Sequence, residues 1–293
     1  MFDYQQKYAQ YLQTFEEYLQ AYAEKLKTTP PILGDAMRYS LLSGGKRIRP
    51  VLMLATAEIL GIDAQDVLPY ATALEMIHTY SLIHDDLPAM DNDDFRRGKP
   101  SCHKAFGEAY AILAGDALLN QALSIVLEMG LKGEKYTLAA KLLSDYAGMN
   151  GMILGQIADM QFTSSGESLS EEQLRFIQEY KTGKLLLASL LIPSILADNR
   201  YYIRLEQFGK EFGRLFQITD DILDVEGEFD QLGKSVGKDE DSDKFTCVKL
   251  YGLQGAKLRA DDCLARCRAV LEGIDYDTDF LEALAISVRE RNA

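Results

Sequence analysis

Two groups of closely spaced aspartates constrain this chain more than any other feature. The first occupies residues 85–94 (DDLPAMDNDD) and the second occupies residues 220–224 (DDILD). Carboxylates at this density repel one another unless a multivalent cation lies between them. Ligand sets made only of oxygen atoms suit hard ions such as Mg²⁺, which proteins commonly share between carboxylates and a substrate phosphate. The two groups therefore predict a divalent-metal site for a phosphorylated substrate.

Composition excludes several classes of partner. The chain has 293 residues, 47% of them hydrophobic, which is enough for a sizeable core. Its formal net charge of −14 argues against binding to nucleic acid or to an anionic membrane surface. We expect no membrane span, because the longest apolar candidate, residues 185–197, is short and contains Pro193.

The cysteines and the first residues indicate a cytoplasmic protein. The four cysteines form no C-x-x-C pair, so we expect reduced thiols rather than a zinc site or disulfides. The first residues, MFDYQQK, lack the charged-then-apolar pattern of a secretory signal.

Helical periodicity runs along nearly the whole chain, and no β-alternation is bounded by turn signals. Helices are expected at residues 4–26, 50–60, 67–87, 108–129, 134–149, 151–162, 203–225, 246–272 and 278–290. Another should begin at Ser170, where SEEQ has the pattern of a capping box. Loops are expected at residues 27–34, 88–101, 163–169 and 226–243. The pattern predicts one all-α domain over residues 1–293.

The first aspartate group lies at the end of an expected helix. Residues seven apart share a helix face, so His78 and Asp85 should point the same way, with Ser81 between them. Pro88 should end the helix, which places Asp85 and Asp86 at its negative C-terminal end. Bound cations would make that arrangement tolerable. The alternative is a solvated acidic turn.

The second aspartate group lies within a helix. Asp220 and Asp224 are one turn apart and can face one ion together, and Gln217 precedes Asp221 by a turn. A solvated helix face is the alternative. Five apolar residues leave little room for such a face: Phe216, Ile218, Ile222, Leu223 and Val225.

Two basic segments can hold a diphosphate without metal. Residues 43–50 (SGGKRIRP) place glycines, which allow close approach of the backbone, before three cations. Residues 96–100 (RRGKP) form a second cationic turn, and arginine presents a fork that matches phosphate oxygens. Each segment alone is also compatible with a solvated basic turn.

A third basic segment interrupts an apolar helix. Lys181 and Thr182 lie among leucines, where unpaired polar groups are costly, so they indicate a polar cavity. Gly183 weakens a helix by ~1 kcal/mol, which favours a local kink. The alternative is a lysine that reaches solvent from a core helix.

Together these motifs resemble the trans-isoprenyl diphosphate synthases, and among them the bacterial farnesyl diphosphate synthase type. The matching segments keep the family's order: 44–50 (GGKRIRP), 82–91 (LIHDDLPAMD), 96–100 (RRGKP), 181–184 (KTGK) and 216–224 (FQITDDILD). The resemblance implies an all-α isoprenoid-synthase-type bundle around a central active-site cavity. It also implies Mg²⁺-dependent head-to-tail condensation of isopentenyl diphosphate with dimethylallyl and then geranyl diphosphate.

The resemblance also assigns metal ligands. Asp85 and Asp91 would bind two Mg²⁺ ions, with Asp86 beside them. Asp220, assisted by Asp224, would bind a third.

The remaining roles follow from the same resemblance. The allylic diphosphate would contact Arg96, Lys181 and Lys234, with Lys244 as a further contact. Isopentenyl diphosphate would be held by Lys46, Arg49, His78 and Arg97. The allylic cation would face the Lys181 carbonyl, the Thr182 hydroxyl and the Gln217 amide. In relatives a terminal arginine can cover the isopentenyl site, and Arg289 and Arg291 match that pattern weakly.

Product length should depend on what blocks the cavity below the metal ions. Tyr80 lies five residues before Asp85, about 7.5 Å further down the helix, and Ser81 is one residue nearer. A bulky aromatic side chain at this depth resembles the farnesyl type and predicts a C15 product. The alternatives are a C20 geranylgeranyl product, and a Tyr80 that only packs the helix.

Other functions fit the motifs less well. A terpene cyclase of the same fold would usually alter the second aspartate group and lose the isopentenyl contacts. A non-catalytic partner subunit would tend to lose one aspartate group. A structural protein that binds divalent ions would not explain the basic segments. Relatives are homodimers, so a homodimer is expected, with the apolar helix near 108–129 as a contact surface.

Overall fold

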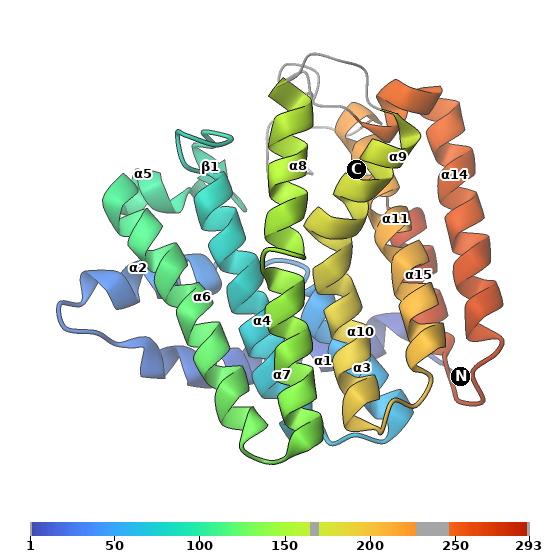
Figure 1. Ribbon diagram of the computed structural model, residues 1–293, viewed down its shortest axis with the longest axis horizontal. Helices are drawn as coiled ribbons and strands as arrows, with labels where there is room; N and C mark the ends of the chain where they lie inside the picture. The colour runs from blue at the N-terminus through green and yellow to red at the C-terminus, as the bar shows by residue number, and fades with distance from the viewer. Residues whose placement is uncertain (1, 165–169, 227–245, 292–293) are drawn as a thin grey trace. The chain divides into compact units, whose positions relative to one another are not determined.

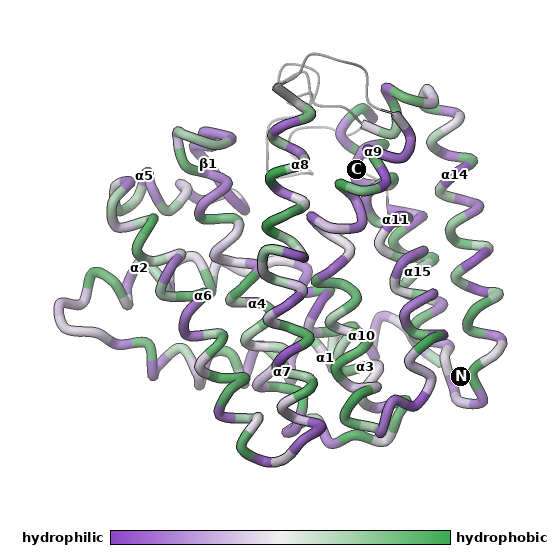
Figure 2. The backbone as a smooth tube through the Cα atoms, in the orientation of Figure 1, coloured by the Kyte–Doolittle hydropathy of each residue, from purple (hydrophilic) through white to green (hydrophobic). Residues whose placement is uncertain are grey.

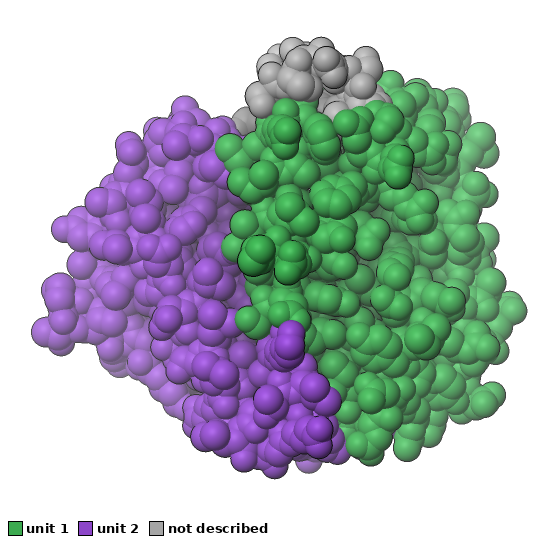
Figure 3. Space-filling model, in the orientation of Figure 1, with its two compact units in different colours: residues 1–4, 142–293 green, residues 5–141 purple. Residues whose placement is uncertain are grey.

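The computed structural model describes residues 2–164, 170–226 and 246–291, and this part of the chain is helical almost throughout (Figure 1). The expected all-α class is therefore confirmed. The chain divides into two compact units, one formed by Gln5–Lys141 and the other by Met1–Tyr4 with Leu142–Ala293 (Figure 3). The single domain over residues 1–293 stays a prediction.

The unit Gln5–Lys141 is organised around one long helix, α4. Its elements are α1 (Tyr4–Ala23), η1 (Glu24–Leu26), α2 (Ile32–Leu41), α3 (Ile48–Leu60), α4 (Ala64–Asp85), β1 (Phe95–Arg96), β2 (Lys99–Pro100), α5 (Cys102–Phe106), α6 (Glu108–Gly130) and α7 (Glu134–Ala147), which crosses into the other unit's residues. Helix α4 packs against α2, α3 and α6 and is buried around most of its circumference, because its sequence is apolar on nearly every side. It ends at Asp85, shortly before Pro88, as predicted.

Helix α6 departs from one expectation. By length and composition alone it is apolar enough to cross a membrane, although no membrane span was expected from the sequence. Its charges are few, and its leucine, isoleucine and alanine residues keep its mean hydropathy high. Core helices of water-soluble proteins meet the same criteria, and α6 packs against α4 and α2. It also exposes Ile112, Leu113 and Leu127.

The other unit is built from helices that run beside α11. Its elements are α8 (Met152–Ser164), α9 (Glu171–Ile177), the π-helical segment η2 (Gln178–Gly183), α10 (Lys184–Leu196), α11 (Tyr202–Glu226), α14 (Cys247–Leu271) and α15 (Asp279–Arg289). Helix α11 packs against η2, α10, α14 and α15. Helix α10 is apolar along most of its length (Figure 2), and its residues from Leu185 to Leu196 are buried.

Several predicted boundaries are confirmed by their local chemistry. Helix α3 contains Pro50 in its first turn and ends at Gly61, which adopts a left-handed conformation. Helix α9 begins after Ser170, which forms the expected capping box with Gln173. The predicted loop 27–34 is wrong at its end, because α2 already begins at Ile32.

The predicted loop 88–101 also contains more order than expected. Strands β1 and β2 pair as a two-residue antiparallel hairpin within it, and α5 follows directly. Strands this short contain no alternation that a sequence pattern can reveal. The predicted loop 226–243 lies outside the described residues except for Glu226, which ends α11.

A buried ion-pair group fixes the turn between α2 and α3. The Arg47 side chain is 0% exposed and donates to Glu75 Oε1 at 2.7 Å, Glu16 Oε1 at 2.7 Å and the Leu41 carbonyl at 2.8 Å. Burial alone would lower the pKa of Arg47, but Glu75 and Glu16 raise it above its ordinary value. These contacts join α1, α4 and the end of α2 at one guanidinium.

Removing Glu75 should therefore destabilise the protein strongly. Glu75→Ala leaves Arg47 buried without its principal counter-ion, which should cost about 3–5 kcal/mol of unfolding free energy. Glu58→Ala is the matched control, because the Lys7–Glu58 pair is solvent-exposed and should contribute less than about 1 kcal/mol. Equal losses for the two variants in urea denaturation would contradict the structural role of Glu75.

Candidate functional site

The two basic segments meet in the unit Gln5–Lys141. Arg97 donates to the Gly44 carbonyl and, at 3.3 Å, to Ser43 Oγ. A Cβ atom on Gly45, whose φ is +120°, would lie 2.9 Å from the Arg97 guanidinium carbon. The positive φ therefore favours glycine at this position, and a Cβ atom would also displace the Arg97 side chain. The structure thus brings together the segments 43–50 and 96–100.

The three cations of the first segment have different environments. Arg47 is buried with Glu75 and is not available to a ligand. Lys46 is exposed and Arg49 is half-buried. Glu75 was not among the residues predicted from the sequence. Its signal was an acidic residue within an otherwise apolar stretch of helix.

Arginine side chains from both segments surround His78. Burial, followed by Arg49, Arg97, Arg47 and Arg96, lowers the pKa of His78 well below its ordinary value. The pKa of Arg97 is also lowered. Burial is the largest cause, and the neighbouring Arg47 and Arg96 lower it further. Positive charge beside a neutral imidazole is an arrangement that suits an anion.

The first aspartate group folds back on the end of α4. The Asp91 N–H donates to the Asp85 carbonyl at 2.8 Å, which brings the two residues together. Asp86 differs from both, because its side chain is buried and pairs with Arg96. Arg96 also contacts Asp93 Oδ2 at 3.2 Å. Burial raises the pKa of Asp86 and Arg96 opposes that shift. Asp85 is half-buried and Asp91 is exposed.

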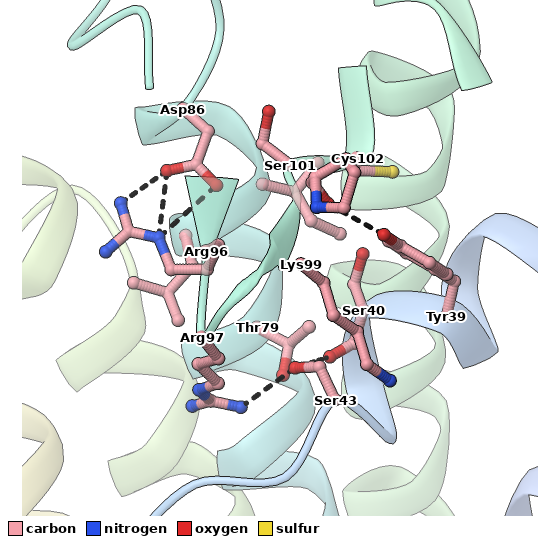
Figure 4. Close-up of a pocket in the computed structure, with 13 residues that line it drawn as sticks. Tyr39, Ser40, Ser43, Thr79, Asp86, Arg96, Arg97, Lys99, Ser101 and Cys102 are labelled. Carbon is pink, nitrogen blue, oxygen red and sulfur yellow. Dashed lines mark hydrogen bonds and ion pairs between the residues drawn. The ribbon is translucent and has the colours of Figure 1, made fainter. Parts of the chain in front are cut away.

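A small pocket lies between the first aspartate group and the basic segments. Figure 4 shows Arg96 directed toward Asp86 on one side and Arg97 directed toward Ser43 on the other. The Tyr39 hydroxyl donates to the Pro100 carbonyl at 2.8 Å and ties the hairpin to α2. The hairpin that the sequence did not reveal is therefore what positions Arg96 and Arg97.

Tyr80 and Ser81 lie on α4 before this group. Tyr80 is buried and packs edge-to-face against His84 with ring centroids 5.7 Å apart. Burial, with a further contribution from Asp85, raises the pKa of Tyr80 to about 12, so its hydroxyl stays neutral. The half-buried Ser81 donates to the His78 carbonyl at 2.9 Å.

The second aspartate group lies on α11 in the other unit. Asp221 Oδ2 accepts the Cys247 N–H at 2.7 Å, at the start of α14. Asp220 Oδ1 accepts from Arg291 at 3.3 Å, and that guanidinium lies 4.7 Å from the Phe216 ring centroid. Asp224 is buried. The terminal arginine thus contacts the second aspartate group in this structure.

Lys181 lies in the π-helical turn η2, which is the local distortion expected near Gly183. Its Nζ donates to Asp159 Oδ2 of α8 at 2.5 Å. Helix α8 approaches closely because it has Gly155 there: a Cβ atom would lie 2.1 Å from the Lys181 nitrogen. Asp159 was not predicted from the sequence, although a carboxylate one turn after Gly155 in an apolar helix was a signal for it. Thr182, like Gln217 on α11, is half-buried.

Within the described ranges, no three His, Cys, Asp or Glu side chains are grouped closely enough to hold a metal ion. The donor chemistry nevertheless suits a hard ion, because both aspartate groups offer only carboxylate oxygens. Substrate oxygens and water would have to complete the coordination. Lys234 and Lys244, two of the predicted diphosphate contacts, lie outside the described residues.

Solved structures similar to this one come from isoprenoid enzymes. A geranyltransferase from Legionella pneumophila is 34% identical, with a TM-score of 0.86, over 99% of this chain and 98% of that one. A geranyltransferase from Helicobacter pylori, complexed with magnesium and isoprenyl diphosphate, is 32% identical, with a TM-score of 0.80, over 94% and 95% of the two chains.

Relatives known by sequence agree with this. The farnesyl diphosphate synthase of Micrococcus luteus is 47% identical over 89% of each chain. The enzyme of that name from Geobacillus stearothermophilus is 46% identical over 85% of this chain and 84% of its own. A chloroplastic geranylgeranyl pyrophosphate synthase from Capsicum annuum is 45% identical over 84% of this chain and 68% of its own. The family model for polyprenyl synthetase matches residues 30–271, and the chain belongs to this family of prenyltransferases.

Proposed function

We propose that this protein condenses isopentenyl diphosphate with dimethylallyl and then geranyl diphosphate to give farnesyl diphosphate. The observation that carries the proposal is the cluster of arginines around a neutral His78, directly beside the first aspartate group. Such a site can bind one diphosphate through cations alone and a second through metal-bridged carboxylates. Several bacterial relatives named farnesyl diphosphate synthase support this choice of substrates.

Isopentenyl diphosphate is the ligand that we assign to the basic segments. Lys46, Arg49 and Arg97 would bind its phosphate oxygens, and the neutral His78 imidazole would donate a hydrogen bond. The interaction of Arg97 with the Gly44–Gly45 turn supports this role, because it holds the guanidinium in place before the ligand arrives.

The allylic diphosphate is assigned to the two aspartate groups. Asp85 and Asp91 would hold two Mg²⁺ ions, and Asp220 with Asp224 a third, as expected for hard ions shared with a diphosphate. When bound, Mg²⁺ neutralises charge that develops on the departing diphosphate. The related enzyme from Helicobacter pylori, complexed with magnesium and isoprenyl diphosphate, supports this ligand pair.

Cationic side chains would complete the allylic site. We assign diphosphate contacts to Arg96, Lys181, Lys234 and Lys244. Arg96 pairs with Asp86 and Lys181 with Asp159, so both cations are held by a carboxylate and can share their remaining N–H groups with phosphate oxygens.

Neutral dipoles would protect the allylic cation once the carbon–oxygen bond breaks. We assign this role to the Lys181 carbonyl, the Thr182 hydroxyl and the Gln217 amide. An uncompensated carboxylate at this position would risk trapping the cation. The π-helical turn supports the assignment, since a departure from α-helical bonding frees backbone carbonyls for other contacts.

A geranylgeranyl diphosphate synthase is the second candidate, because relatives with that name are 41–45% identical to this chain. A terpene cyclase or a non-catalytic partner subunit is less well supported, because both aspartate groups and all four isopentenyl contacts are present.

We further propose that residues 1–293 form one domain that works in the cytoplasm as a homodimer. The exposed apolar residues of α6 would supply the dimer contact.

Product analysis tests the proposed reaction. Pure protein, Mg²⁺ and isopentenyl diphosphate should convert both dimethylallyl and geranyl diphosphate to a product whose released alcohol is C15 farnesol.

Asp85→Ala and Asp220→Ala should each reduce turnover by at least about a hundredfold, because they remove charge stabilisation of the leaving group. Unchanged circular dichroism would show that the helices remain. No product from either allylic substrate would refute the proposal, and full turnover in either variant would refute its metal assignment.

Tyr80 should limit the product length. Tyr80→Ala is expected to shift the main product from C15 to C20, because it removes the buried ring below Asp85. Tyr276→Ala, which removes an exposed aromatic ring, should leave the product at C15. A C15 product from Tyr80→Ala would show that another residue closes the cavity.

His78 should make stability depend on pH. Its pKa is lowered in the folded state, so the unfolded chain takes up a proton near pH 6.5 while the native imidazole stays neutral. The free energy of unfolding should therefore fall as the pH decreases below about 6.5. In urea titrations between pH 7 and pH 5, the free energy of unfolding of His78→Gln should therefore fall less than that of the unmodified protein. Identical pH profiles for both proteins would contradict the lowered pKa.

A further inference from the structure

A cationic pocket lies outside the residues assigned to prenyl transfer. It is a cavity of about 380 Å³ within the unit that contains Leu142–Ala293, lined by α9, α11 and α14. A neighbouring groove of about 500 Å³ shares four of its lining residues, so the two are continuous. The shared residues are Arg175, Glu211, Arg214 and Arg266.

The lining of this pocket and groove has a charge opposite to that of the whole chain. Six cationic residues line them: Arg175, Arg204, Lys210, Arg214, Arg259 and Arg266. Three carboxylates, Glu171, Glu211 and Asp262, oppose them, which leaves a net charge of +3 in a chain of −14. A positive hollow in an acidic protein concentrates anions locally.

The arginines of the pocket are only partly neutralised by the carboxylates that line it. Glu211 is shared by Arg214 at 3.1 Å and Arg266 at 2.8 Å, so one carboxylate compensates two guanidiniums. Arg259 lies 3.1 Å from Glu171 and stacks 3.6 Å from the Tyr251 ring centroid. Among residues that the structure describes, the ion pairs of the pocket involve Arg214, Arg259 and Arg266 and not Arg175.

We propose that this pocket binds a hydrophilic polyphosphate anion, of which inorganic diphosphate is the simplest. Arginine forks match phosphate oxygens, and several forks around one cavity favour an anion with more than one phosphate. The lining is predominantly polar and charged, with Leu174 and Ile218 as its aliphatic members, so it offers little surface for a prenyl chain.

The pocket adjoins two elements of the proposed active site. Ile218 lies on α11 between Gln217 and Asp220, and Gln178 is the first residue of the π-helical turn that contains Lys181. Cys247, also in the lining, donates its N–H to Asp221. A bound polyphosphate would thus contact the same helices that position the second aspartate group.

Metal-free calorimetry tests the proposal. In EDTA, inorganic diphosphate would be titrated into Lys46→Gln/Arg49→Gln protein, in which the site assigned to isopentenyl diphosphate is weakened. This protein should still bind one diphosphate per chain, and adding Arg175→Gln and Arg266→Gln should weaken that binding at least tenfold. A parallel titration with ATP distinguishes a nucleotide site from one that accepts only free diphosphate.

The matched control adds Arg200→Gln and Arg268→Gln instead, which removes the same charge from arginines outside the pocket lining of the same unit. Its affinity should stay within twofold of the background protein. Arg175→Gln alone serves if the double change unfolds the protein, since Arg175 has no described ion pair to lose. Equal binding by the pocket and control variants, or no binding by the background protein, would overturn the proposal. No prenyl substrate is present, so the outcome does not depend on the proposed reaction.

Discussion

Charge compensation is the constraint on which the structure of this protein depends. Acidic side chains gathered at two points of the sequence would repel one another without nearby cations. In the structure Asp86 pairs with Arg96, and Asp220 contacts Arg291. The proposed ligands would extend this compensation. Mg²⁺ would add positive charge beside the carboxylates, and the diphosphate would add negatively charged oxygens beside the cationic side chains.

The cations in the unit Gln5–Lys141 serve two separable purposes. Arg47 is fully buried and joins three helical segments, so its charge belongs to the fold. Arg49 and Arg97 lower the pKa of His78, and we propose that their charge binds a diphosphate. The buried Arg47 ion pairs fix the turn from which the neighbouring cations extend. The same contacts that stabilise the fold therefore also preorganise the site.

The sequence predicted the helices well, because local patterns determine them, whereas the roles of the site residues stay predictions. The capping box at Ser170 and the left-handed Gly61 are confirmed in the structure. The sequence did not reveal Glu75, Asp159 or the contact of Arg291 with Asp220, because each joins residues far apart in the chain. It also missed the β1–β2 hairpin, whose strands are too short for alternation, although this hairpin orients Arg96 and Arg97.

The most direct test of the account is a comparison of ligand binding with and without metal. Calorimetry would measure the affinity for isopentenyl diphosphate and for an unreactive thiolo analogue of geranyl diphosphate, in Mg²⁺ and in EDTA. Cations alone should hold the first ligand, so its affinity should change little, whereas binding of the analogue should weaken at least about tenfold without Mg²⁺. Equal metal dependence for both ligands would contradict the division of the site into a cationic part and a carboxylate part.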